Sequence, residues 1–274
     1  MRLDGKTILI TGSTDGVGQR VAERLGAMGA RALVHGRDHG RGARVVDDLH
    51  AAGAEAIFYP ADLASLAEVR RLADTIRNDH DRLDVLVNNA GIGSGGRWAM
   101  RQVSADGHEL RFAVNYLAGF LLTALLLPML RTSTPARIVN VASAGQYPID
   151  FDDVMITRGY SGGRAYTQSK LAQIMFSFDL AQRLNNTGVT VTCLHPATYM
   201  DTTMVRQAGT TPLSSVDDGA DAIINLAVAP ELEGCTGLYF NRLQEAQANP
   251  QAYDQTARAT LRDLSLRLTG LAPA

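Results

Sequence analysis

The sequence is poor in cysteine, in net charge and in uninterrupted apolar segments. Its only two cysteines, Cys193 and Cys235, lie far apart in apolar stretches, which indicates neither a disulfide framework nor a zinc site, so we expect two buried thiols and no bound metal. The formal net charge of the 274 residues is −2 at pH 7. Without a basic excess a surface does not attract nucleic acid or an anionic membrane, so a small molecule is the expected partner.

Targeting and membrane-spanning segments are also missing from the pattern. The N-terminus, Met1–Lys6, has no apolar core of the signal-peptide type. The most apolar run, Leu117–Leu130, is interrupted by Gly119 and Pro128 and is shorter than the roughly 20 residues that a spanning helix needs. We therefore expect a cytoplasmic protein with no membrane span.

Short apolar runs alternate with amphipathic stretches along the chain. Runs such as Ile8–Ile10 and Val85–Val87 are apolar at consecutive positions, as in strands that are buried on both faces of a parallel sheet. Seven strands are predicted, at Thr7–Thr11, Ala32–Gly36, Ala56–Asp62, Leu83–Asn88, Arg137–Ala142, Val189–Leu194 and Gly237–Asn241. Helical patterns between them include Val17–Met28, Leu66–Arg77, Glu109–Leu127, Arg164–Leu184 and Ala220–Val228. This order predicts an α/β, doubly wound Rossmann fold with a seven-stranded parallel sheet and helices on both faces, in one domain over residues 1–274.

Three regions fall outside this alternation. Residues 146–163 and 199–215 lack a periodic apolar face and follow predicted strands, so we interpret them as substrate loops. The second of these is a candidate lid, with an ordinary surface connection as the alternative. The tail at 244–274 has a helical apolar pattern, and three roles stay open for it: covering the site, joining a partner or packing locally.

A glycine-rich turn follows the first predicted strand and opens the first helix. Glycines at this place allow a tight turn and a close approach of the backbone to a pyrophosphate at the helix N-terminus. An incidental glycine turn is the alternative. The spacing Gly-x3-Gly-x-Gly predicts dinucleotide contacts from Gly12, Ser13, Thr14, Asp15, Gly16, Val17 and Gly18.

The residues after the second predicted strand distinguish the two nicotinamide dinucleotides. An acidic residue there would bind the adenosine ribose hydroxyls of NAD, but the sequence has Gly36 followed by Arg37. The guanidinium of Arg37 offers charge-assisted hydrogen bonds to a 2′-phosphate, which favours NADP(H). A solvated loop charge is the alternative for Arg37.

Tyr166 and Lys170 are four positions apart in a helical pattern and project from one face. A tyrosine has an ordinary pKa of about 10 and exchanges a proton near neutral pH only if a nearby cation favours the phenolate. Lys170 is in position to be that cation. The pair therefore predicts general acid–base chemistry by Tyr166.

The sequence resembles the short-chain dehydrogenase/reductase family over roughly residues 6–241. The resemblance rests on these motifs, on Asn88–Gly91 after the fourth predicted strand and on Ser143 after the fifth. The resemblance implies that Ser143 holds the substrate oxygen, that Tyr166 is the general acid/base and that Lys170 binds the nicotinamide ribose and lowers the pKa of Tyr166. Asn115 stands where the family has an asparagine that completes its proton relay. The 23 positions from Ser143 to Tyr166 resemble the retinol-dehydrogenase-like and protochlorophyllide-reductase-like branch, which implies an apolar ketone, aldehyde or secondary alcohol as substrate.

The same resemblance implies further cofactor contacts. The adenine is expected beside Asp62 and Leu63, and the nicotinamide beside the turn after the sixth predicted strand, with contacts from Pro196 and Thr198. That turn departs from the family because Ala197 replaces a glycine, which puts its backbone shape in doubt. His195 before it is interpreted as a packed or capping residue. The adenosine ribose is expected beside Asn89, Ala90 and Gly91.

The prediction is an NADP(H)-dependent oxidoreductase that interconverts a carbonyl and an alcohol by hydride transfer, with a homo-oligomer possible through Glu109–Leu127 and Arg164–Leu184. Two alternatives stay open. One is a catalytically silent NADP(H)-binding regulatory protein. The other is a serine hydrolase, because Gly159–Gly163 has the form G-x-S-x-G around Ser161, although the residues before it make a poor strand.

Overall fold

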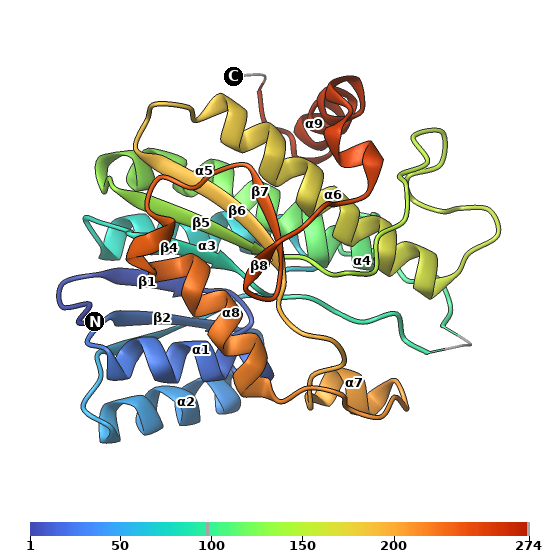
Figure 1. Ribbon diagram of the computed structural model, residues 1–274. Coiled ribbons are helices and arrows are strands. Elements are labelled where there is room, and N and C mark those ends of the chain that lie inside the picture. Colours follow the sequence, from blue (N-terminus) through green and yellow to red (C-terminus); the bar gives the residue numbers. More distant parts are fainter. Residues whose placement is uncertain (97–98, 273–274) are drawn as a thin grey trace.

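The structure, a computed structural model that describes residues 1–96 and 99–272, contains one sheet in the order β3-β2-β1-β4-β5-β6-β7-β8 (Figure 1). Seven strands run parallel, so the predicted doubly wound α/β fold is confirmed. The strands are β1 (Thr7–Ile10), β2 (Arg31–Gly36), β3 (Ala56–Pro60), β4 (Val85–Asn88), β5 (Ala136–Val141), β6 (Val189–His195), β7 (Leu238–Asn241) and β8 (Gln244–Glu245). All residues of β1 and β4 are buried, as consecutive apolar residues require.

The prediction of seven strands was one short. The chain reverses after β7 through Arg242 and Leu243, and the two-residue β8 pairs antiparallel with β7. Arg242 adopts a left-handed φ of 59°, which permits the tight reversal. Both residues of β8 are exposed, so the strand lacks the apolar run by which the other strands were predicted.

Helices cover both faces of the sheet (Figure 1). The helices α1, α2 and α8 lie over one apolar core, and α3, α5 and α6 lie over the other. The helices are α1 (Gly16–Ala27), α2 (His39–Ala51), α3 (Leu66–Asp79), α4 (Leu110–Phe112), α5 (Ala118–Thr132), α6 (Gly162–Arg183), α7 (Thr203–Gln207), α8 (Val216–Val228) and α9 (Gln255–Thr269), with a π-helical turn at Ala113–Leu117 and 3₁₀ turns at Pro230–Leu232 and Pro250–Tyr253.

The apolar run before β5 is longer than predicted. One continuous helix runs over Leu110–Thr132 and consists of α4, the π-helical turn and α5. Gly119 and Pro128 lie within this helix and do not end it. Its 23 residues are long and apolar enough to cross a membrane by length and composition alone, so the helix is longer than the apolar run Leu117–Leu130 that the sequence indicated. Within the molecule 67% of its apolar window is buried, and the helix forms part of the core.

The C-terminal tail packs locally. Helix α9 lies along α6, where Arg262 pairs with Asp179 at 2.7 Å and the hydroxyls of Tyr116 and Ser265 are 2.7 Å apart. Leu261 in the same helix is 1% exposed and joins the core. Of the predicted tail, residues 273–274 lie outside the described part.

The strand order reverses between β1 and β4, where the connections leave toward opposite faces of the sheet. In a doubly wound sheet a crevice forms at the carboxyl ends of the strands at this point, and ligands bind there. The glycine-rich turn after β1, Asn89–Gly91 after β4 and Ser143 after β5 all follow carboxyl ends at or beside the reversal. The fold therefore brings the predicted site residues to one edge of the sheet.

Candidate active site

The glycine-rich turn has the shape of a phosphate cradle. Gly12 and Gly16 adopt left-handed φ values of 65° and 56°, and a Cβ atom on Gly12 would lie 2.8 Å from the Cα atom of Ala90. Asp15 precedes α1 without a side-chain cap, so the first N–H groups of this helix are not satisfied by it. These residues fit the pyrophosphate of a dinucleotide.

A buried histidine holds the turn in place. The Nδ1 atom of His35 accepts a hydrogen bond from the backbone N–H of Gly12 at 3.0 Å, and the backbone N–H of His35 donates to Oγ of Ser13. His35 is 2% exposed, and burial lowers its pKa to about 4. The ring is therefore neutral at neutral pH and able to accept. The prediction did not include His35, because a histidine within a strand carries no signal of its contact with a distant turn.

The end of β2 leaves no room for an acidic side chain. A Cβ atom on Gly36 would lie 2.6 Å from Oγ1 of Thr14, so these two residues pack directly on each other. Arg37 is exposed beside them. Asp38 caps α2 and pairs with Arg41 at 3.2 Å, and Arg41 lies 3.7 Å from Asp15 of the turn. Arg41 is thus a second cation near the turn, which the prediction omitted.

The residues after β4 brace the turn. The Nδ2 atom of Asn89 donates to the carbonyl oxygens of Thr11 and Gly12 at 2.8 and 3.1 Å, and Oγ1 of Thr11 accepts from the N–H groups of Asn89 and Ala90. The amide of Asn89 therefore bonds the protein backbone in this structure. Its predicted contact with an adenosine ribose stays a prediction.

The remaining cofactor candidates lie at neighbouring strand ends. Leu63 is buried and Asp62 is half-buried after β3, where the Asp62 carboxylate accepts from the N–H of Ala64. After β6, Nε2 of His195 lies 3.0 Å from Oγ1 of Thr198, which agrees with a packed histidine. Ala197 is 4% exposed and is not among the residues with positive φ, so its side chain is accommodated without strain; Pro196 beside it is buried.

Ser143 and Tyr166 are brought together from the end of β5 and the first turns of α6. Burial raises the pKa of the Tyr166 phenol, although the neighbouring Ser143 hydroxyl acts in the opposite direction by favouring the ionised phenol. The Tyr166 phenol is therefore protonated at neutral pH in this structure. The lowering of the Tyr166 pKa by Lys170 stays a prediction.

Lys170 lies against the ring of Tyr166, and Asn115 and Lys170 both border Gly91. Lys170 is 4% exposed, its Nζ atom is 5.9 Å from the centre of the Tyr166 ring, and burial lowers its pKa to about 7. Asn115, in the π-helical turn, accepts from the N–H of Ile92 at 2.7 Å and donates to the hydroxyl of Ser169 at 3.0 Å. π-helical turns within α-helices are frequent at functional sites, and this one contains the predicted site residue Asn115.

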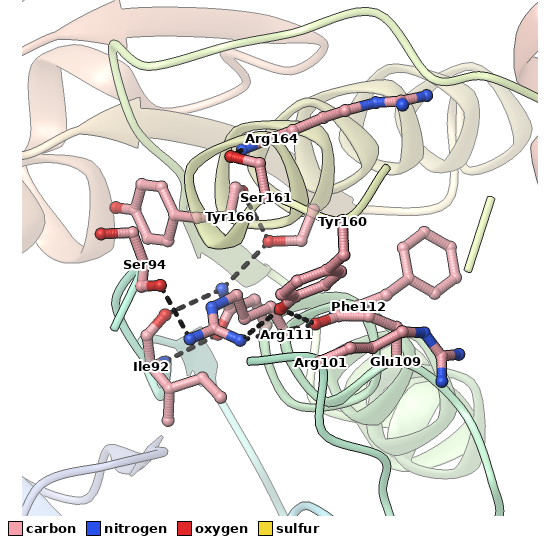
Figure 2. A network of polar contacts seen from close by, with 12 residues as sticks. Ile92, Ser94, Arg101, Glu109, Arg111, Phe112, Tyr160, Ser161, Arg164 and Tyr166 are labelled. Carbon is pink, nitrogen blue, oxygen red and sulfur yellow. Dashed lines mark hydrogen bonds and ion pairs between the residues drawn. The ribbon is translucent and has the colours of Figure 1, made fainter. Parts of the chain in front are cut away.

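A buried ionic network that the sequence analysis missed joins three segments of the site (Figure 2). Arg111 donates to the carbonyl oxygens of Gly93 and Ser94 at 2.9 and 2.8 Å and to the hydroxyl of Tyr160 at 2.6 Å. That hydroxyl donates to Glu109 at 2.9 Å, and burial together with Glu109 raises the pKa of Tyr160 to about 12. The network ties the loop after β4 to the helix of Asn115 and to the start of α6. The hydrogen bond between Tyr160 and Glu109 joins residues 51 positions apart, so spacing gave no signal.

Ser161 does not form a nucleophile elbow. It is the exposed N-cap of α6, where its hydroxyl accepts from the N–H of Arg164, and irregular chain rather than a strand precedes it. Figure 2 shows the Ser161 side chain beside Arg164 on this first turn. The arrangement agrees with the helix-capping interpretation of the sequence and gives the hydrolase alternative no support.

The region 199–215 lies over the turn and the loop after β4. A Cβ atom on Gly16 would lie 3.2 Å from Cγ2 of Thr202, and one on Gly93 would lie 3.0 Å from Cγ of Met204. The region contains the short helix α7, none of whose residues is buried. A lid role for this region stays a prediction.

Comparisons with known proteins agree with this architecture. The family model described as short chain dehydrogenase matches residues 6–212. The chain is 35% identical to human retinol dehydrogenase 13, over 98% of this chain and 86% of the relative. It is 36% identical to human retinol dehydrogenase 14, over 98% of this chain and 88% of the relative. The structure of an uncharacterised protein from Mycobacterium paratuberculosis superposes with a TM-score of 0.82 at 28% identity, over 100% of this chain and 97% of that one. The NADP complex of Pseudomonas aeruginosa RhlG superposes with a TM-score of 0.71 at 30% identity, over 88% of this chain and 95% of that one.

The chain therefore belongs to the short-chain dehydrogenase family, in its retinol-dehydrogenase-like branch, and is an oxidoreductase that uses a nicotinamide nucleotide and acts on a small molecule. One expectation must be corrected. Cytoplasmic location was predicted from the composition of Met1–Lys6 and from a short apolar run, but the retinol dehydrogenases to which the chain is similar are typically membrane-associated.

We predict that His35 makes folding sensitive to acid. The unfolded chain binds a proton at the His35 ring as the pH falls below about 6.5, whereas the folded protein does so only near pH 4. Stability is therefore lost between these values, by about 3 kcal/mol. The His35→Asn variant keeps an acceptor for Gly12 but not the proton site. In urea unfolding at pH 7 and pH 4.5, the wild type should lose more stability than the variant; equal losses would contradict this.

We predict that Tyr160→Phe lowers the free energy of unfolding by about 1–3 kcal/mol, because Glu109 and Arg111 then each lose a buried hydrogen bond. The exposed Tyr147 provides the matched control, since Tyr147→Phe should change stability by less than about 0.5 kcal/mol. Urea unfolding of the three proteins gives both values. A Tyr160→Phe variant as stable as the control would show that the network does not hold the segments together.

Proposed function

We propose that the protein interconverts an apolar carbonyl compound and its alcohol with NADP(H), using Tyr166 as general acid/base. The observation that carries the proposal is the convergence of Ser143, Tyr166 and Lys170 between the end of β5 and the first turns of α6. The nicotinamide, when bound, supplies or accepts the hydride. The single-domain organisation over residues 1–274 and a homo-oligomer remain predictions.

The protein side of the reduction follows from the site. The Ser143 hydroxyl is next to the Tyr166 phenol and is placed to donate to a carbonyl oxygen bound between them. As negative charge develops on that oxygen, the protonated phenol donates its proton. The phenolate that remains is stabilised by the Lys170 ammonium. In the alcohol-oxidising direction the same groups act in reverse order.

Preference for NADP(H) is supported by the end of β2. Thr14 packs on Gly36, so no carboxylate can stand there to bind ribose hydroxyls. Arg37 and Arg41 lie on the two sides of Asp38 and present positive charge next to the turn. Two structural relatives, from Pseudomonas aeruginosa and Burkholderia cenocepacia, have NADP bound.

An apolar substrate is supported by the character of the lid and of the relatives. Met204 lies over Gly93, and Tyr199 at the start of the lid is 52% exposed. The curated relatives reported above are named for retinol, an apolar alcohol. A test panel therefore contains all-trans-retinal, aliphatic aldehydes, apolar ketones and quinones.

We predict that Tyr166→Phe lowers kcat/KM for the best substrate of this panel by about 100-fold or more, because the variant has no proton to donate. NADPH oxidation at 340 nm measures turnover, and quenching of protein fluorescence by NADPH measures binding, which should remain. Binding without any turnover in the wild type would favour the silent regulatory protein instead.

We predict that Arg37→Asp weakens NADPH binding by about 10- to 100-fold, because a charge-assisted bond to the 2′-phosphate is replaced by repulsion. Binding of NADH should change little, since it lacks that phosphate. Arg44→Asp, on the exposed side of α2, is the control for a general change of charge. Equal losses for the two cofactors would exclude Arg37 as a 2′-phosphate contact.

A further inference from the structure

The buried ammonium of Lys170 is held by two neutral acceptors. Its Nζ atom donates to the carbonyl oxygen of Val141 at 2.8 Å, at the end of β5, and to Oε1 of Gln173 at 2.9 Å, one turn further along α6. Lys170 and Gln173 are each 4% exposed. Gln173 is thus the one side chain, in the described part of the chain, that accepts a hydrogen bond from this cation.

The groups that face Lys170 come from several elements. Tyr166 lies on the same helix, and His195 at the end of β6 has a pKa lowered by burial, by Arg242 and by Lys170 itself. The uncharged Asn115 and Lys170 both border Gly91, where a Cβ atom would lie 3.3 Å from Oδ1 of Asn115 and 3.5 Å from Nζ of Lys170. None of these groups is a carboxylate, so dipoles alone compensate the charge.

On its other side Gln173 borders a small cavity. The cavity has a volume of about 10 Å³, close to that needed for one water, and Asn88 and Asn115 also line it. Oδ1 of Asn88 is buried without a hydrogen-bond partner among the described residues. Gln173 therefore lies between the ammonium and a small internal cavity that is lined by both polar and apolar side chains.

We propose that Gln173 is a positioning residue for the proton step: its neutral amide oxygen fixes the Lys170 ammonium beneath Tyr166 and sets how readily that ammonium gives up its proton. A carboxylate at this place would hold the proton on Lys170 far more strongly. A neutral acceptor orients the cation and leaves it titratable near neutral pH, in keeping with the pKa of about 7 that burial gives Lys170. The catalytic consequence rests on the proposed function, but the effect on Lys170 does not.

The test measures Lys170 directly. The sequence has only two lysines, Lys6 and Lys170, so protein grown with ¹³Cε-lysine gives two side-chain NMR signals, and Lys6→Arg assigns them. Titration of the protein without cofactor gives the pKa of Lys170. Gln173→Glu should raise it by about one to three pH units, and Gln173→Met, which removes the acceptor, should lower it.

Gln168 provides the matched control. It lies on the same helix, is 1% exposed, and bonds the backbone of Val154 and Asp150 instead of Lys170. Gln168→Met should leave the pKa of Lys170 unchanged, so a general disturbance of α6 is distinguished from loss of the contact. Far-UV circular dichroism identifies the variants that fold, and Gln173→Asn, which shortens the side chain, replaces any that do not.

Two readouts separate the proposal from the proposed function. If the pKa of Lys170 stays within about 0.3 pH unit of the wild type in the folded Gln173 variants, the proposal is overturned whatever their activity. If the pKa moves and the pH dependence of kcat/KM moves with it, the proposal is supported in full. If the pKa moves but no carbonyl substrate is reduced even by the wild type, Gln173 positions Lys170 as proposed and the assigned activity is wrong.

Discussion

A buried cation held only by neutral groups is the constraint on which the candidate site depends. Removing an ammonium from water is costly unless acceptors replace its hydration, and here the carbonyl of Val141 and the amide of Gln173 do so. One acceptor comes from the end of β5 and the other from α6. Sheet and helix must therefore pack in one register for Lys170 to be buried at all, and that register also places Tyr166 beside Ser143.

The cofactor half of the site depends on a comparable convergence. The turn after β1 is bonded by Asn89 from the end of β4 and by His35 from β2, so three neighbouring strands define its shape. The Arg111 network likewise fixes the loop after β4 by bonding it to the segment that precedes α6. Backbone carbonyls and buried polar side chains, rather than apolar contacts alone, hold the loops of the site.

Much of this was predictable from sequence where local pattern carries the information. Continuous apolar runs gave seven of the strands, and the glycine spacing gave the turn between β1 and α1. Helix α2 was not predicted, because only Val45 and Leu49 among its buried residues are large and apolar. His35 and Arg111 contact residues that are distant in the sequence, so their sequence neighbourhood carried no signal. Gln173 lies in α6, most of which is buried, so no polar face distinguished it from its neighbours.

The central claim is that hydride reaches a carbonyl carbon while Tyr166 supplies the proton. The most direct test is reduction of the best panel substrate with NADPH carrying deuterium at C4 of the nicotinamide, on one face and then on the other. The account predicts that one of the two preparations delivers one deuterium to the carbinol carbon, and that Tyr166→Phe slows formation of this product by about 100-fold or more. Alcohol formed without deuterium from either preparation would contradict the account.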